Sequence, residues 1–317
     1  MKIPALAAAA VLLLPAAPGS VFSQENEAPA APTTGAPPDP FGNLETPVSA
    51  KPYEFEVDRD RGSLSLAAKD GQYAEGSHFA NWNWTLNAKR WGRYFVKIRY
   101  TSTTSKIGVQ LKVGETVLKS YAPRSGGHLD HQQHTLTIGY AYLDRPGEYP
   151  VMLLTGDKSN GPLFFLKAVE FTPAPESDEF GQSIDGTIEL HAKNATTFAE
   201  NMRFEPKPEK NCLGFWTQPD DWAEWTVDVT TPGKFKVDLV QGCGDGNGGS
   251  EVALMVNDQT VKFKVEETGG FQSWKNRDLG VVELPHSGEH RIALKPLNLA
   301  GKAVMDVQKI VLTPVKS

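Results

Sequence analysis

The chain has 317 residues, of which 39% are hydrophobic and 22% charged, with 29 Gly, 23 Pro and two Cys. Its length predicts about two domains. Its formal charge of −6 argues against nucleic-acid binding, which needs a basic face to neutralise phosphates. Two Cys allow at most one disulfide, which excludes a cysteine framework or a four-Cys zinc site.

The N-terminus has the pattern of a secretory signal peptide. Lys2 precedes an apolar run over residues 3–14 that is too short to span a bilayer, and small residues precede a cleavage point before Gln24. We therefore expect residues 1–23 to be a signal peptide and the protein to be exported, to the periplasm, the cell surface or the medium. Residues 24–52 hold seven prolines, which is typical of a disordered Pro/Ala-rich linker. No later apolar run is long enough to span a membrane.

After the linker, similar sequence segments recur in the same order. The matching pairs are residues 62–70 (GSLSLAAKD) and 186–194 (GTIELHAKN), residues 92–98 and 233–239, residues 109–113 and 252–256, and residues 169–173 (VEFTP) and 310–314 (IVLTP). A pattern of this length repeated once indicates two copies of one structural unit. We predict two homologous domains, residues 53–174 and residues 184–317.

Each copy is predicted to be almost entirely β-strand. Residues 235–239, for example, alternate apolar and polar side chains, the period expected of a sheet with one buried face. Turn residues, for example Pro232 and Gly233, recur about every 8–12 residues, and no long stretch has helical periodicity. The pattern predicts an all-β chain made of two tandem β-sandwiches.

Four motifs of the second copy carry a family resemblance. They are residues 220–229 (DDWAEWTVDV), 232–235 (PGKF), 268–274 (TGGFQSW) and 288–292 (GEHRI). Through them the second copy resembles the family 6-like carbohydrate-binding modules, which are jelly-roll sandwiches of the galactose-binding-like superfamily. The first copy resembles them more loosely. The resemblance implies two tandem jelly-roll domains that bind a polysaccharide or another glycan, with secreted polysaccharide-processing enzymes as partners.

Aromatic side chains are the first candidates for glycan contact, because the C–H faces of sugars stack on rings. Alternate side chains of a strand point to the same face, and Trp84 and Trp225 share theirs with apolar neighbours, so we assign both to the hydrophobic cores of the two domains. The ligand-binding candidates lie off the predicted core face or in loops, where the family places its sugar-binding rings; they are Trp216, Trp222, Phe271 and Trp274. The alternative for each is packing beneath a loop.

The resemblance also implies a polar glycan contact from the loop before the last strand. In the second copy this loop offers Asn298, and in the first copy it offers Asn160. An amide can both donate to and accept from sugar hydroxyls. An Asn in a turn can instead serve the backbone.

The sequence offers two candidate metal sites. The resemblance implies a structural calcium in the second domain, held by Glu189 on the first strand and Asp306 at the start of the last. In the first copy, histidines replace two of the loop aromatics, which makes sugar binding there less expected. The resulting cluster consists of His128, Asp130, His131 and His134. It suits either a transition metal or a solvated loop. No other cofactor is expected.

The two cysteines are expected to form a disulfide. Cys212 and Cys243 lie just outside the two strands of a predicted hairpin with its turn at Pro232 and Gly233, so the hairpin would bring them together. Export permits their oxidation, and closing this loop would be worth about 3–4 kcal/mol.

Sequence motifs for catalysis are sparse. No Gly-x-Ser-x-Gly elbow and no His-Glu-x-x-His occurs. Asp220, Asp221 and Glu224 could supply the carboxylate pair of a glycoside hydrolase, or they are simply a solvated acidic face. The leading interpretation is an exported, non-catalytic carbohydrate-binding protein that acts mainly through its second domain. The alternatives are a structural or protein-interaction protein of the cell surface, and a β-sandwich glycoside hydrolase or lyase.

Overall fold

The computed structural model describes residues 53–72, 81–104, 106–127, 129–156, 163–178 and 180–316. The predicted signal peptide and linker, together with His128 and Asn160, lie outside these residues. Apart from strands, the described part contains three short 3-10 helices: η1 (Ala68–Asp70), η2 (Asp130–Gln132) and η3 (Ala192–Asn194). None of its helices is long and apolar enough to cross a membrane.

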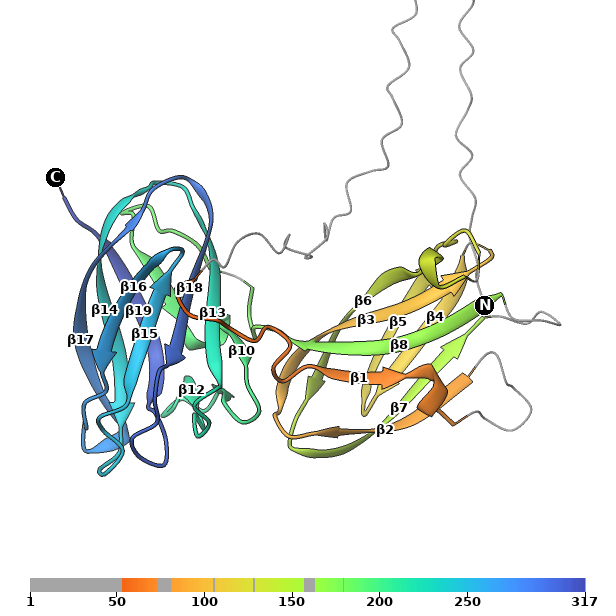
Figure 1. Ribbon diagram of the computed structural model, residues 1–317, viewed down its shortest axis with the longest axis horizontal. Coiled ribbons are helices and arrows are strands. Elements are labelled where there is room, and N and C mark those ends of the chain that lie inside the picture. The colour runs from red at the N-terminus through yellow and green to blue at the C-terminus, as the bar shows by residue number, and fades with distance from the viewer. Residues whose placement is uncertain are drawn as a thin grey trace, which may run out of the picture. The chain divides into compact units, whose positions relative to one another are not determined.

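The first sandwich consists of two antiparallel four-stranded sheets (Figure 1). In spatial order, one sheet contains β1 (Leu64–Ala67), β8 (Phe164–Pro173), β3 (Gly92–Ser102) and β6 (His134–Leu143). The other contains β2 (Asn81–Ala88), β7 (Gly147–Thr155), β4 (Ile107–Val113) and β5 (Thr116–Ala122). Every second side chain of β4 is buried, so this strand turns one face to the core, as the period-two pattern predicts.

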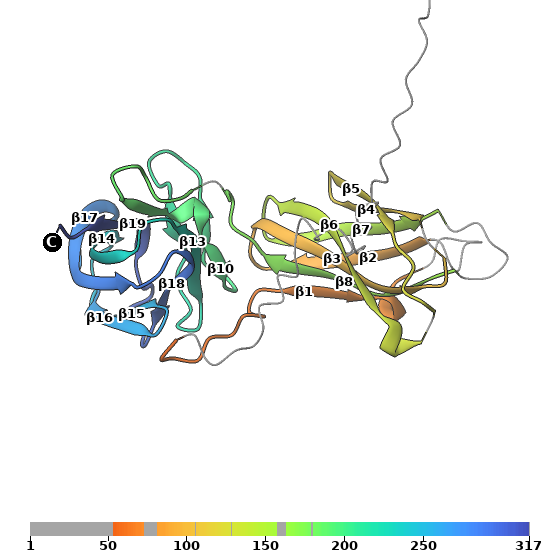
Figure 2. The ribbon, with the colours of Figure 1, turned by 90° about the horizontal axis from the view of Figure 1, so that it is seen from above.

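The second sandwich has the same layered construction with additional short strands. One sheet contains, in order, β11 (Arg203–Glu205), β12 (Cys212–Gly214), β19 (Asp306–Pro314), β14 (Gly233–Cys243) and β17 (Gly270–Leu284), with β9 (Ile188–His191) also paired to β19. The other contains β10 (Thr196–Phe198), β13 (Trp222–Val229), β18 (Gly288–Pro296), β15 (Glu251–Val256) and β16 (Gln259–Lys264). Figure 2 shows β14, β17 and β19 in one layer and β15, β16 and β18 in the other.

The two sandwiches share one strand order. The sheet β1-β8-β3-β6 corresponds to β9-β19-β14-β17, and β2-β7-β4-β5 corresponds to β13-β18-β15-β16. A register shift also recurs at the same place: Gly139 lies opposite Val96 and Gly280 opposite Val237, and both glycines have a positive φ. The predicted all-β fold of two tandem sandwiches is confirmed. The exact domain boundaries stay a prediction.

Each sandwich encloses its own hydrophobic core, and a tryptophan lies in each. Trp84 donates its indole N–H to the carbonyl oxygen of Ala67 (3.0 Å), and Trp225 donates to that of His191 (2.8 Å). Each bond ties the tryptophan strand to the first strand of the same sandwich. The core assignment of both tryptophans is therefore confirmed.

Residues 53–61, which we call the strap, pack on the outer face of the β13-β18-β15 sheet (Figure 1). Tyr53 is buried there with Phe55 and Val57 partly covered beside it, an alternation that gives the strap one apolar face. Tyr53 donates its hydroxyl to Glu224 (2.5 Å), and Arg59 donates two hydrogen bonds to the same carboxylate (2.8 and 2.7 Å). The sequence prediction placed these residues in the first domain, but their contacts are with the second sandwich.

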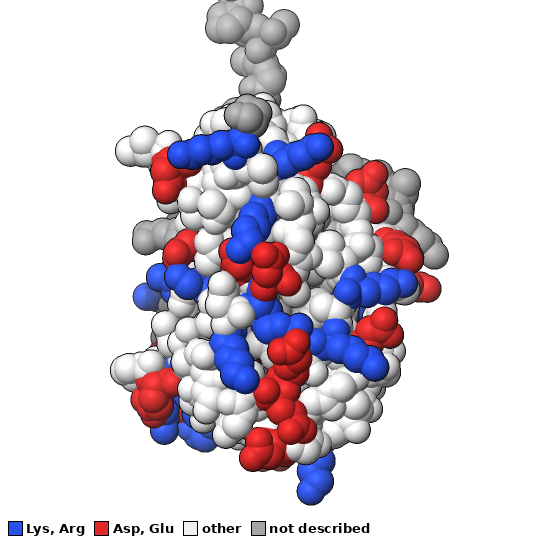
Figure 3. All heavy atoms as spheres, turned by 90° about the vertical axis from the view of Figure 1, so that its left-hand side faces the viewer, with Lys and Arg blue, Asp and Glu red and all other residues white. Residues whose placement is uncertain are grey.

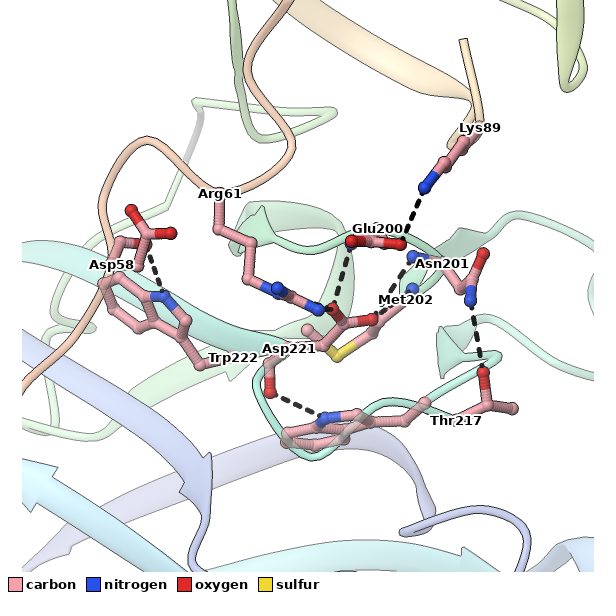
Figure 4. A network of polar contacts seen from close by, with 10 residues as sticks. Asp58, Arg61, Lys89, Glu200, Asn201, Met202, Thr217, Asp221 and Trp222 are labelled. Carbon is pink, nitrogen blue, oxygen red and sulfur yellow. Dashed lines mark hydrogen bonds and ion pairs between the residues drawn. The ribbon is translucent and has the colours of Figure 1, made fainter.

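Ion pairs and hydrogen bonds connect the two sandwiches within one compact unit. Lys89 pairs with Glu200 (3.1 Å) and Arg90 donates to Thr197 (2.9 Å), while Arg61 at the end of the strap pairs with the buried Asp221 (2.8 Å) (Figure 4). Asp221 also accepts the backbone N–H groups of residues 200–202. These bonds fix the segment between β10 and β11, because its donors have no partner in a sheet.

The predicted disulfide is absent: Cys212 and Cys243 are both free and buried. The predicted hairpin does not exist, because β13 and β14 belong to different sheets. In the sheet that holds both cysteines, β19 lies between β12 and β14 and separates them. The Cys212 thiol instead donates to Asp306 (3.6 Å).

Candidate functional site

A pocket of about 230 Å³ opens in the second sandwich where β11, β12 and the starts of β17 and β19 come together. Its walls consist of two phenyl rings, an ion pair, a buried carboxyl group and short polar side chains. The lining residues are Glu205, Lys210, Phe215, Thr217, Phe271, Gln272, Ala303 and Asp306. The fold thus brings one predicted ring, Phe271, to the same pocket as one predicted metal ligand, Asp306.

Local backbone features position the two phenyl rings, a left-handed residue at Phe215 and a glycine beneath Phe271. Phe215 has a φ of 57°, a left-handed conformation that non-glycine residues rarely adopt, and 46% of the residue is exposed. Phe271 packs directly on Gly244, where an added Cβ would lie 2.8 Å from the ring. An exposed ring on strained backbone is more typical of a binding site than of a packing element, since strain persists where function requires it.

The first sandwich supports the Phe215 ring through an arginine. The Arg203 guanidinium lies 3.4 Å from the ring centre of Phe215 and 3.4 Å from that of Trp91, between the two rings. Its burial lowers the pKa of Arg203 to about 10, and it keeps its charge at neutral pH. Trp91 therefore helps to orient a wall of the pocket although it does not line it.

Two carboxyl groups share the pocket floor with one cation. Lys210 donates to both oxygens of Glu205 (2.9 and 3.0 Å), while Asp306 accepts from the amide of Gln272 (3.2 Å) and from the Cys212 thiol. Burial, and secondly the charge of Glu205, raise the pKa of Asp306 to about 7. Burial also raises the pKa of the Cys212 thiol, followed by the charges of the two carboxylates.

Two glycines allow the walls of the pocket to pack closely beside Asp306. Gly242 pairs directly with Asp306 in the sheet, and an added Cβ there would lie 2.0 Å from the backbone oxygen of Phe271. A Cβ at Gly214 would lie 2.5 Å from a Glu205 oxygen. Any larger residue at either position would fill the pocket or displace its wall.

The predicted calcium pair is not assembled. Glu189 lies opposite Val311 on β19, five residues or roughly 16 Å along the strand from Asp306, and it pairs with Lys309 (2.9 Å). The ligand atoms of Asp306, Glu205 and Cys212 do lie within 4.8 Å of one another. A buried thiol and a carboxylate held by an ammonium do not fit calcium, which prefers a shell of hard oxygen ligands.

Two of the predicted binding rings are buried. Trp216 is fully buried in the core and donates its indole N–H to the carbonyl oxygen of Asp221 (2.8 Å). Trp222 is also fully buried, stacked on Phe198 beneath the strap. Neither ring offers a face to a ligand in this conformation, so their assignment to the glycan site is corrected.

The other predicted contacts are partly accessible. Phe271 lines the pocket, and Trp274 lies beside it, half-buried, with its ring against Gly242. Asn298 is exposed but outside the pocket, and its side-chain oxygen accepts the backbone N–H of Glu251 (3.0 Å). Asn298 therefore has the backbone role that a turn asparagine commonly has.

The histidine cluster of the first sandwich is open to solvent. His131 and His134 are exposed, and Asp130 pairs with Lys167 (2.7 Å). The described residues show no metal-ligand grouping there; His128 is outside them. For the members of the cluster that the structure describes, this geometry agrees with a solvated loop rather than with a metal site.

Of the three acidic residues considered for catalysis, Asp220 is exposed, whereas Asp221 and Glu224 are buried and bound to other groups. Asp221 is fully buried and bound to Arg61 and to three backbone N–H groups. Glu224 is buried against Tyr53 and Arg59. Neither carboxylate faces a pocket, so this pair does not supply hydrolytic chemistry.

Larger pockets in the first sandwich have less specific chemistry. One of them, of about 710 Å³, includes Tyr142, Tyr149 and an Asp144–Arg145 ion pair. Both charged side chains of this pair are more than 60% exposed, so water already solvates them. The pocket of the second sandwich is the stronger candidate because both of its carboxyl groups, Glu205 and Asp306, are buried.

Sequence reasoning missed Glu205, Lys210 and Phe215. A signal was present: the stretch between the first strand and the tryptophan strand is much longer in the second copy (residues 195–224) than in the first (residues 71–83). The missed residues lie in that insertion. Their convergence on Asp306 could not be read from the sequence, because it depends on the pairing of β12 with β19.

Comparisons with known proteins give the following similarities. A family model described as a domain of unknown function (DUF5077) matches residues 194–317. No curated protein sequence matches the chain. Among solved structures, a family 35 carbohydrate-binding module from Clostridium thermocellum is 16% identical, with 41% of this chain and 98% of that chain covered and a TM-score of 0.35.

Two further structures show the same low level of similarity. The C-terminal CBM6 of LamC, a marine laminarinase from Zobellia galactanivorans, is 16% identical over 40% of this chain and 98% of that chain, with a TM-score of 0.31. A Paenibacillus xanthan lyase is 16% identical over 81% of this chain, with a TM-score of 0.34. This chain covers 25% of the lyase. Similarity of this size assigns no activity to the chain.

Proposed function

We propose that this protein is an exported, non-catalytic carbohydrate-binding protein whose glycan site is the pocket formed by Phe215, Phe271, Gln272 and Asp306. One observation carries the proposal. Two accessible phenyl rings, one on strained backbone, flank buried polar groups in a pocket of about 230 Å³. This combination is what a sugar ring requires, because rings cover its C–H face and fixed polar groups orient its hydroxyls.

The polar groups of the pocket can serve hydroxyls in both directions. The Gln272 amide and the Lys210 ammonium donate, while Asp306 and Thr217 offer acceptor oxygens. On the face seen in Figure 3, basic and acidic side chains are interspersed and no extended basic surface appears. With a formal charge of −6, this agrees with a glycan rather than a nucleic acid as partner.

The test is a glycan array probed with the wild-type protein and with Phe271→Ala. We expect the wild type to bind a limited set of polysaccharides and the variant to lose about fivefold to thirtyfold in affinity, since a stacked ring contributes about 1–2 kcal/mol. Tyr121→Ala is the matched control, because Tyr121 is an aromatic residue of the first sandwich that is 72% exposed and lies outside the pocket.

The outcomes separate this proposal from its alternatives. Wild-type protein that binds no glycan but retains a protein partner would support a structural or protein-interaction role. Turnover of a bound polysaccharide would support a hydrolase or lyase. Export, and partnership with secreted polysaccharide-processing enzymes, are further parts of the proposal, and secretion of the full chain tests the first.

A further inference from the structure

The pocket already holds one ammonium group, which belongs to the protein itself. Lys210 places its Nζ at 2.9 and 3.0 Å from the two oxygens of Glu205 and at 5.6 Å from the ring centre of Phe215. A carboxylate and a phenyl face are together a recognised environment for an ammonium, through charge-assisted hydrogen bonds and the ring quadrupole. In one half of the pocket, Glu205 and Phe215 therefore form a cation site that the Lys210 ammonium occupies.

The other half has the same components without a cation. Asp306 and Phe271 both line it, and Asp306 is 5% exposed. Within the described residues, no Lys, Arg or His forms an ion pair with Asp306; its partners are the Gln272 amide and the Cys212 thiol. Since Lys210 is committed to Glu205, the pocket with Asp306 ionised has two carboxylates and a single cation.

The space for a ligand group above Asp306 is also present. Asp306 and Phe271 both line the pocket of about 230 Å³, while Gly242 and Gly214 let Phe271 and Glu205 pack closely around it. A neutral hydroxyl or an N-acetyl group at this point would leave the buried carboxylate without a counter-charge. A protonated amine would supply that charge and could donate to both Asp306 and the Phe271 face.

Resting on the proposed function, we propose that the pocket selects a glycan with a free amino group, a hexosamine that is not N-acetylated, with its ammonium between Asp306 and Phe271. The ring stacking and the hydroxyl contacts would be common to any hexose. The carboxylate would provide the discrimination, because among the amino, N-acetyl and hydroxyl groups only the ammonium carries a counter-charge.

The experiment is calorimetric titration of the full chain with three tetrasaccharides of one linkage: β-1,4-linked glucosamine, its N-acetylated counterpart and the corresponding glucose tetramer. We expect at least a tenfold preference for the glucosamine tetramer. Asp306→Asn should abolish the preference while residual binding of all three remains. Phe271→Ala should weaken all three.

Controls exclude non-specific attraction of a polycation to an acidic protein. Asp258→Asn removes an exposed carboxylate of a turn outside the pocket and should leave the preference intact. Thermal unfolding of each variant verifies its fold. Equal binding of the three tetramers, or a preference that survives Asp306→Asn, would overturn the inference while the proposed function stands. Binding that requires an added divalent ion would also overturn it, and absence of binding to any glycan would remove the proposed function too.

Discussion

The aromatic residues of the second sandwich differ in what covers them. Trp216 and Trp222 are fully buried, whereas Phe215, one position before Trp216, is 46% exposed. The alternation of side chains along its strand correctly predicted that Trp222 does not belong to the main core of the second sandwich, since its ring packs in a separate hydrophobic cluster. Its burial was not predictable, because it bonds to Asp58, a residue 164 positions away in the chain.

At the residue scale, Asp306 links the pocket to stability. Its pKa is raised from about 3.8 to about 7, so the folded protein holds this proton more tightly than the unfolded chain does. Ionisation therefore costs stability, and the cost grows as the pH rises from about 4 to about 7. Asp306→Asn should unfold at nearly the same temperature as the wild type at pH 4. At pH 8 it should be more stable, by on the order of 2 kcal/mol.

Denaturant unfolding at several pH values measures this difference. Asp258→Asn, an exposed substitution, should show no comparable pH dependence. A stability difference between Asp306→Asn and the wild type that stays constant from pH 4 to pH 8 would mean that Asp306 is not a high-pKa group.

At the element scale, the strap is part of the second sandwich although it precedes the first in sequence. Arg59 and Tyr53 of the strap neutralise and cover Glu224, which is 5% exposed. Sequence patterns could predict the strands, because alternation and turns are local. They could not place the strap, because its alternating residues Tyr53, Phe55 and Val57 fit equally well as an edge strand of the first sandwich.

Removing Arg59 of the strap should destabilise the second sandwich. Arg59→Ala leaves a buried carboxylate short of its counter-charge, and we expect a loss of about 2 kcal/mol in the free energy of unfolding. Adding Glu224→Gln to this variant should recover part of the loss, because the uncompensated charge disappears. Arg124→Ala, an exposed substitution in the first sandwich, serves as the control.

Chemical denaturation of the three single variants and the double variant forms the required cycle. A double variant with the summed losses of Arg59→Ala and Glu224→Gln would show that the two residues do not interact across the strap.

At the scale of the whole molecule, the repeat predicted the shared strand order, and the insertion in the second copy explains where the copies differ. Strands β10 to β12 have no counterpart among the described strands of the first sandwich, and Glu205 of β11 and Phe215, which follows β12, line the pocket. The first sandwich reaches this site through Trp91, which stacks on Arg203. A glycan site of this kind would therefore depend on both sandwiches although its lining comes from one.

Amide hydrogen exchange of the full chain, with and without a saturating concentration of the strongest glycan from the array, tests the central claim most directly. We predict slower exchange at residues 214–217 and 271–274, with little change on the exposed strands of the first sandwich. Protection confined to the first sandwich, or exchange unchanged by a bound glycan in both segments, would contradict the assignment of the glycan site to this pocket.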